Sequence, residues 1–137
     1  IFFSNYESPK FFEFESHNQI SAVIYWSKIN TQIRMKAKIK KTSKAFNNNY
    51  FKSRSPEKNA LAISSNQSSK IDSYQEILEK YNFAKKTADL KICPNYWGGF
   101  SFKPYQIEIW EGHDFRLNKR DSYSFEKNSW IHSILEP

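Results

Sequence analysis

The sequence is poor in cysteine and glycine, with one and three residues respectively among 137, and it contains no long hydrophobic run. Because Cys93 is alone, the chain cannot form an internal disulfide or a cysteine-rich metal site. The adjacent Gly98 and Gly99 do not form a Walker or dinucleotide-binding fingerprint. No apolar run approaches the roughly 20 residues needed to cross a bilayer, and no signal-peptide pattern opens the chain. We therefore expect a cytoplasmic protein that has no membrane partner.

The three histidines do not indicate hydrolytic or metal chemistry. His17, His113 and His132 stand in unrelated contexts, and no serine lies in a nucleophile-elbow pattern. No pair of His, Cys or carboxylate residues has a recognised ligand spacing. The sequence thus argues against a hydrolytic triad and predicts no bound metal.

Positive charge is what the sequence has in excess. Its 21 Lys and Arg outnumber its 14 Asp and Glu, and the formal charge of +7 favours an anionic partner such as a phosphate ester, nucleic acid or acidic lipid. From Arg34 to Lys40, basic residues alternate with apolar ones, which is better explained as the solvated face of a strand than as a nucleic-acid stripe. We expect no nucleic-acid partner. Nucleic-acid binding nevertheless stays open as a hypothesis, and it predicts salt-sensitive binding to DNA or RNA.

Hydrophobic periodicity predicts a mainly antiparallel β-structure with several helices. A helix is expected to begin at Pro9, two more lie within residues 42–64 on either side of Ser55 and Pro56, and a fourth follows Asp72. Strand segments are expected at residues 1–5, 19–26, 32–40, 98–104 and 106–112. The turn between 19–26 and 32–40 predicts that these two strands form an antiparallel hairpin, and another hairpin is expected at 122–135. The pattern predicts one domain over residues 1–137, a partly closed barrel with peripheral helices, which lacks an N-terminal segment.

Several polar side chains suit a ligand that carries both an anion and a planar ring. Arginine can hold a phosphate through two hydrogen bonds, while Gln and Ser can bond the edge of a heterocycle. The sequence therefore favours a phosphorylated aromatic ligand. The candidate residues are Lys10, Gln32, Tyr50, Arg54, Gln67, Ser68, Trp110, Arg116 and Arg120.

Four segments stand in a fixed order along the chain. They are FFSNYESPK, YWSKINTQIRMKAKIKK, YFKSRSPEKNALAISSNQSS and WGGFSFKPYQIEIWEGHDFRLNKR, and the chain ends in ILEP. In this order and spacing they resemble the motifs of the pyridoxamine 5′-phosphate oxidases, flavoproteins with an FMN-binding split-barrel fold. The resemblance covers nearly the whole chain and implies an antiparallel split β-barrel of the α+β class with peripheral helices.

The resemblance also implies an activity and a set of site residues. An FMN-dependent homodimer, with both subunits contributing to each site, would oxidise pyridoxamine or pyridoxine 5′-phosphate to pyridoxal 5′-phosphate. O2 would reoxidise the flavin and yield H2O2, while the protein positions the partners. The residues implied to contact FMN are Phe3, Ser4, Lys10, Gln32, Gln67, Ser68, Trp110 and Arg120. Those implied to bind the phosphorylated B6 vitamer are Tyr50, Arg54, Lys58, Arg116 and Asn118, with Arg116 and Asn118 as the catalytic pair.

The chain departs from the family pattern inside the implied site. R-L-H-D-R is RLNKR here, so Asn118 replaces a histidine and cannot titrate near neutrality, and Lys119 replaces an aspartate. Pro9 replaces an arginine that would contact phosphate, and Lys58 replaces a serine. A second hypothesis therefore stays open, that of a diverged FMN-binding split-barrel flavoprotein that acts on another substrate.

Overall fold

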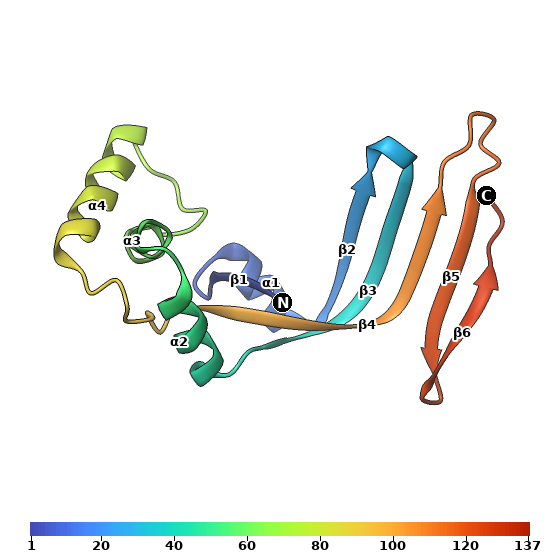
Figure 1. Ribbon diagram of the computed structural model, residues 1–137, viewed down its shortest axis with the longest axis horizontal. Helices are drawn as coiled ribbons and strands as arrows, with labels where there is room; N and C mark the ends of the chain where they lie inside the picture. Colours follow the sequence, from blue (N-terminus) through green and yellow to red (C-terminus); the bar gives the residue numbers. More distant parts are fainter. The chain divides into compact units, whose positions relative to one another are not determined.

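The computed structural model describes residues 1–137 and divides into two compact units (Figure 1). Unit 1 comprises Ile1–His17 and Lys40–Ser101, and unit 2 comprises Asn18–Ile39 and Phe102–Pro137. The predicted single domain over 1–137 stays a prediction. The elements are, in order, β1 (Phe2–Asn5), α1 (Pro9–Ser16), β2 (Gln19–Trp26), the 3-10 turn η1 (Ser27–Ile29), β3 (Thr31–Lys41), α2 (Lys44–Ser53), α3 (Pro56–Ser64), α4 (Tyr74–Thr87), β4 (Trp97–Glu111), β5 (Lys119–Glu126) and β6 (Ser129–Ile134).

Proline and serine mark where the helices of unit 1 begin. Pro9 and Pro56 stand in the first turn of α1 and α3, where the missing N–H costs nothing. Ser43 and Ser73 cap α2 and α4, because each hydroxyl accepts a hydrogen bond, at 3.2 Å, from the main-chain N–H three residues further on. The four predicted helices are confirmed.

Aromatic side chains form the core of unit 1. Phe11, Phe51, Trp97 and Phe100 are buried, and the ring of Phe51 meets that of Trp97 edge-on with centroids 5.0 Å apart. The strand β1 pairs antiparallel with the first residues of β4, from Phe2 opposite Phe100 to Asn5 opposite Trp97. Because two aromatic residues near the start of β4 are buried here, this end of the strand is anchored against α1 and α2.

A polar network fixes α2 to the beginning of β4. The Asn47 amide donates to the Tyr6 hydroxyl at 3.1 Å and accepts from the N–H of Gly99 at 3.0 Å. The carbonyl of Gly99 in turn accepts from the hydroxyls of Tyr6 and Thr42, both at 3.0 Å. At Gly98 a Cβ atom would collide with the Tyr6 hydroxyl and the Asn47 amide. Glycine is therefore required where the backbone passes this close to a side-chain network.

The sheet of unit 2 is built from hairpins. β2 and β3 pair from Gln19 opposite Lys38 to Trp26 opposite Thr31, as the sequence predicted. β5 pairs with β4 on one side and with β6 on the other, and the strand order is β2-β3-β4-β5-β6 (Figure 1). β1 lies off this order and pairs with the part of β4 that belongs to unit 1. The β5–β6 turn places Lys127 and Asn128 at φ values of 47° and 65°, the two positive φ values that a type I′ hairpin turn requires.

One strand differs from its prediction. The sequence indicated two segments broken at Pro104 and Tyr105, but β4 is continuous over Trp97–Glu111. Residues 97–100 pair with β1 and residues 106–111 pair with β5, so the missing N–H of Pro104 interrupts neither of these ladders. The predicted mainly antiparallel fold with several helices is confirmed. No helix in the structure combines the length and the apolar character needed to span a membrane.

Candidate functional site

A cleft in unit 1 brings together residues that the sequence assigned to substrate and to cofactor. Its volume is about 200 Å³, and its wall includes Arg54 and Lys58 from the α2–α3 region, Gln67 from the loop after α3, and Asn5 and Trp97 from paired positions on β1 and β4. Arg54 and Lys58 were predicted to bind the substrate and Gln67 the cofactor. Asn5 and Trp97 were not predicted as site residues.

Arg54 is held at the end of α2 by aromatic and main-chain contacts. Its guanidinium carbon lies 4.4 Å from the centre of the Trp97 ring, and Nη2 donates to the carbonyl of Lys58 at 3.2 Å. The other terminal nitrogen, Nη1, is buried and has no hydrogen-bond partner. Burial lowers the pKa of Arg54, although the group stays cationic. A buried, unpaired donor on a cation is a group that an anionic ligand would satisfy.

Gln67 connects the loop after α3 to β1. Its side-chain oxygen accepts hydrogen bonds from the main-chain N–H of Asn5 at 2.9 Å and from the hydroxyl of Ser4 at 3.2 Å. The structure therefore joins Ser4 and Gln67, two of the predicted cofactor contacts. Since the oxygen is used in this way, the NH2 group of Gln67 is the part of the amide that can bond a ligand.

The rings of Phe3 and Tyr50 are stacked, with centroids 3.9 Å apart and planes 6° from parallel. Phe3 also stacks on Trp97 at 5.0 Å. The sequence had assigned Phe3 to the cofactor and Tyr50 to the substrate, and the structure places the two in direct contact. Because Tyr50 remains 41% exposed, one part of its surface is still open to a ligand.

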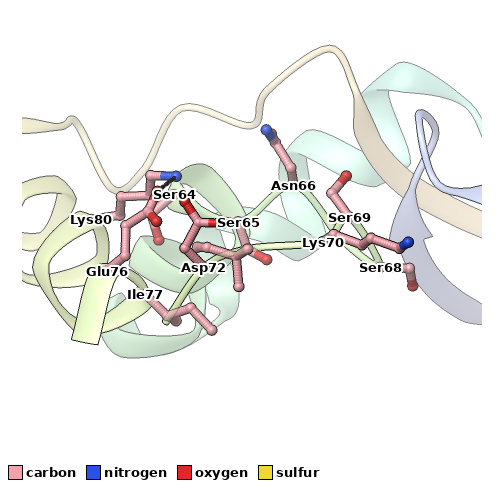
Figure 2. Close-up of a pocket in the computed structure, with 11 residues that line it drawn as sticks. Ser64, Ser65, Asn66, Ser68, Ser69, Lys70, Asp72, Glu76, Ile77 and Lys80 are labelled. Carbon is pink, nitrogen blue, oxygen red and sulfur yellow. Dashed lines mark ion pairs between the residues drawn. The ribbon is translucent and has the colours of Figure 1, made fainter. Parts of the chain in front are cut away.

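Ser68 and Lys10 lie away from the cleft lining. Ser68 has a φ of 67° and lines a second cavity, of about 310 Å³, beside the start of α4. Figure 2 shows Ser68 and Lys70 toward one end of this lining and the Glu76–Lys80 ion pair toward the other. Lys10 is exposed in the first turn of α1. The cofactor roles of Ser68 and Lys10 stay predictions.

In unit 2, three predicted cofactor contacts are linked through two residues that the sequence did not single out. Glu108 accepts hydrogen bonds from Arg120 Nε at 2.8 Å and from Arg34 Nη1 at 3.2 Å. Arg34 also donates from Nε to Gln32 at 3.1 Å, and its guanidinium lies 5.4 Å from the centre of the Trp110 ring. Hydrogen bonding from Arg120 is the main cause that lowers the pKa of Glu108.

Arg116 and Asn118, the predicted catalytic pair, lie in the loop between β4 and β5. Arg116 is exposed and adopts a φ of 62°, and its N–H donates to the carbonyl of His113 at 2.9 Å. The side-chain oxygen of Asn118 accepts from the N–H of His113 at 3.0 Å. Asn118 thus closes the loop that carries Arg116, and its remaining NH2 group is the part that could donate to a substrate.

Lys119, which departs from the family motif, forms ion pairs that balance its positive charge. Its ammonium lies 3.1 Å from Asp121 and 3.3 Å from Glu111. These hydrogen bonds, led by that to Asp121, raise the pKa of Lys119. Asp121 also bonds His132 at 2.7 Å. The lysine therefore does not add an isolated positive charge beside Asn118.

Similarity to known proteins shows the family. Residues 97–137 match the model described as the pyridoxine 5′-phosphate oxidase C-terminal dimerisation region. The chain is 32% identical over 138 residues to the pyridoxine/pyridoxamine 5′-phosphate oxidase of Coxiella burnetii, covering 100% of this chain and 70% of the relative. The chain belongs to the pyridoxine/pyridoxamine 5′-phosphate oxidase family. The family member of Leptospira biflexa is 35% identical over 138 residues, and the chain spans 65% of its length.

Solved structures show the same fold. PhzG from Burkholderia lata, in complex with tetrahydrophenazine-1-carboxylic acid, gives a TM-score of 0.89 at 21% identity. The match covers 99% of this chain and 67% of the PhzG chain. A pyridoxamine 5′-phosphate oxidase-related, FMN binding protein from Nostoc punctiforme gives a TM-score of 0.76 at 14% identity. This match covers 99% of this chain and 72% of the Nostoc chain. The predicted split-barrel fold is confirmed by this likeness.

Proposed function

We propose that this chain is an FMN-dependent oxidase that converts pyridoxamine or pyridoxine 5′-phosphate to pyridoxal 5′-phosphate, with O2 as electron acceptor and H2O2 as by-product. With pyridoxamine 5′-phosphate, water is consumed as well and the amine nitrogen leaves as ammonia. The observation that carries this proposal is the cleft that brings together Lys58, Gln67 and Arg54, whose guanidinium has one nitrogen, Nη1, without a hydrogen-bond partner. A phosphate ester would supply the acceptor that the guanidinium lacks and the negative charge that both cations favour.

The substrate residues of unit 1 have complementary chemistry. Arg54 is held by Trp97 and by the Lys58 carbonyl, so little conformational entropy is lost when it binds an anion. Lys58, which replaces the family serine, is exposed and supplies a second, more flexible positive charge. Tyr50 offers a hydroxyl and part of an aromatic ring. Together they would orient a phosphorylated ring by its ester end.

The cofactor residues fit a flavin mononucleotide by their donors and rings. Ser4, Gln67 and Ser68 in unit 1 and Gln32 in unit 2 bring hydroxyl and amide groups suited to a heterocycle edge, while Lys10 and Arg120 bring positive charge. Phe3 and Trp110 add apolar ring surface. The chemistry that FMN would supply when bound is two-electron oxidation at the 4′-carbon of the substrate, with O2 as the final acceptor. The protein would contribute binding, orientation and exclusion of water.

The loop between β4 and β5 would hold the reacting ring. Arg116 would lie over this ring, and the free NH2 group of Asn118 would donate a hydrogen bond to a substituent on it. Asn118 cannot exchange a proton near neutrality, so these two residues would position the substrate and leave proton transfer to solvent or substrate. Residues 97–137 match a dimerisation region, and we propose that two copies of the chain form the active molecule.

The test is a titration of the purified chain with FMN followed by an assay on the same sample. Saturable quenching of FMN fluorescence, formation of pyridoxal 5′-phosphate and an equal amount of H2O2 are expected. A chain that binds no FMN would contradict the cofactor assignment. A chain that binds FMN yet oxidises neither phosphate ester would contradict the substrate assignment. Light scattering on the same sample measures whether the molecule is a dimer.

A second candidate is an FMN oxidase of the same fold that acts on a different ring. Two features favour it: Asn118 replaces the family histidine at a position proposed to contact the reacting ring, and its neighbour Lys119 is paired with Glu111 and Asp121. The variant Asn118→His separates the two candidates. The second candidate is favoured if the wild-type chain oxidises pyridoxine 5′-phosphate poorly and Asn118→His raises kcat/KM for this substrate by about tenfold or more.

A further inference from the structure

One carboxylate in unit 2 joins two arginines through a single oxygen. The side chain of Glu108 is 13% exposed, and its Oε1 lies 2.8 Å from Arg120 Nε and 3.2 Å from Arg34 Nη1. A carboxylate that is mostly withdrawn from water must be paired and hydrogen-bonded, and Glu108 is both. Neither Glu108 nor Arg34 was predicted to belong to the site, although both stand inside the family motifs.

Strand geometry places these residues on one face of the sheet. Glu108 and Trp110 are two residues apart on β4, so their side chains point to the same side. Trp110 lies directly opposite Arg120 on β5. Arg34 reaches the same face, since it contacts both Glu108 and Trp110. The face therefore carries a connected group of side chains, which we name the arginine network: Gln32, Arg34, Glu108, Trp110 and Arg120.

The two arginines are fixed by different sets of bonds. Arg120 donates from Nε to Glu108 and from Nη1 to the carbonyl of Glu136 at 2.9 Å, so the plane of its guanidinium is set from two sides. Its Nη2 takes part in neither bond. Arg34 donates to Glu108 and to Gln32 and stacks on Trp110. Removal of Glu108 would therefore release Arg120 directly, and would release Gln32 and Trp110 through Arg34.

We propose that Glu108 is the positioning residue of the flavin-contacting face: it orients Arg120 and Arg34, and through Arg34 the amide of Gln32 and the indole of Trp110, for contact with FMN. This inference rests on the proposed function. Glu108 does not touch the cofactor in this role. It also sets the local charge, because one carboxylate against two arginines leaves a single net positive charge within the arginine network.

The test compares Glu108→Ala and Glu108→Gln with the wild-type chain. Glu108→Ala removes the hydrogen bonds from Arg120 and Arg34 to the carboxylate. We expect the released Arg120 to lose one charge-assisted hydrogen bond to FMN, which raises the Kd for FMN about tenfold. Glu108→Gln keeps an acceptor oxygen but removes the charge, so a smaller rise in Kd is expected. Its extra net positive charge should make the midpoint potential of bound FMN more positive, because positive charge stabilises the electron-rich, reduced flavin.

The matched control is Glu111→Gln. Glu111 lies on the same strand, three residues further on, and its carboxylate is also ion-paired, with Lys119. This variant should keep the wild-type Kd and midpoint potential. Circular dichroism establishes that each variant is folded, and Glu108→Gln decides the matter if Glu108→Ala is not.

Two results would count against the inference in distinguishable ways. If the wild-type chain binds FMN and Glu108→Gln changes neither the Kd nor the midpoint potential, the positioning role is overturned and the proposed function stands. If the wild-type chain binds no FMN, both are overturned. A purely structural role for Glu108 would lower the unfolding temperature and leave the midpoint potential of the bound flavin unchanged.

Discussion

The main-chain N–H of Asn5 donates a hydrogen bond of 2.9 Å to the side-chain oxygen of Gln67, across 62 residues of sequence. Asn5 is the last residue of β1 and is buried, so its N–H requires a partner. Gln67 supplies that partner and accepts from Ser4 as well. The loop after α3 is therefore fixed to β1 by the same side chain that is proposed to contact FMN.

Substitutions of Gln67 should separate its structural role from its binding role. Gln67→Ala leaves the N–H of Asn5 unpaired, and we expect a loss of about 1–2 kcal/mol in the free energy of unfolding together with weaker FMN binding. Gln67→Glu keeps the acceptor oxygen and loses the NH2 donor, so stability should be retained while the Kd for FMN rises. Chemical denaturation and FMN titration measure the two effects. Gln75→Ala, on the exposed side of α4, is the control and should change neither.

Arg54 should control the affinity for the phosphate ester. Arg54→Met keeps an apolar chain against Trp97 and removes the guanidinium, so we expect KM for pyridoxine 5′-phosphate to rise at least about tenfold, with a smaller change in kcat. Arg54→Lys should recover only part of this loss, since an ammonium cannot make two parallel bonds to phosphate. Steady-state kinetics provide the measurement. Lys52→Met, on the same helix, is the control for lost charge. An unchanged KM in Arg54→Met would place the phosphate elsewhere.

The sequence predicted local structure well because its signals are local. Pro9 and Pro56 mark helix starts, and alternation of apolar residues marks the β2–β3 hairpin. The prediction of a strand break at Pro104 was wrong. Proline normally breaks a strand, and only the pairing partners show that no hydrogen bond to β1 or β5 is lost at this position.

The candidate site was predicted from motifs, and its supporting residues were missed. Motif positions identify Gln67, Arg54 and Arg120 as residue types that suit the ligand. That the oxygen of Gln67 serves Asn5, or that Arg120 is held by Glu108, depends on contacts between distant parts of the chain. One available signal was Glu108 two residues before Trp110, which the strand period places on the same face.

Glu108 should make stability depend on pH. Its pKa is lowered in the folded state, chiefly by the hydrogen bond from Arg120, below the unfolded value of about 4.3. Ionised Glu108 therefore stabilises the folded state above that pH, and this stabilisation is lost as the pH falls through the folded pKa. We expect the unfolding temperature of the wild type to fall below about pH 4 and that of Glu108→Gln to fall less steeply.

The unfolding temperatures of the wild type and Glu108→Gln are compared by circular dichroism from neutral to acidic pH. Glu13→Gln, an exposed position on α1 outside the arginine network, is the control for removing one carboxylate. Asp121, whose pKa is lowered mainly by its bond to His132, contributes in the same direction, so some acid sensitivity should remain in Glu108→Gln. Parallel curves for the wild type and Glu108→Gln would show that the ion pairs of Glu108 add nothing to stability.

Gly98 should tolerate no side chain. A Cβ atom there would meet the Tyr6 hydroxyl and the Asn47 amide, both of which are fixed by the polar network that ends on Gly99. Because these groups belong to an interlocked network and not to flexible chain ends, Gly98→Ala should cost about 1–3 kcal/mol in the free energy of unfolding. Ser101→Ala, on the same strand, is the control and should cost less. Equal denaturation midpoints for the two variants would show that the network moves aside, and that α2 is held to β4 chiefly by the packing of Phe51 on Trp97.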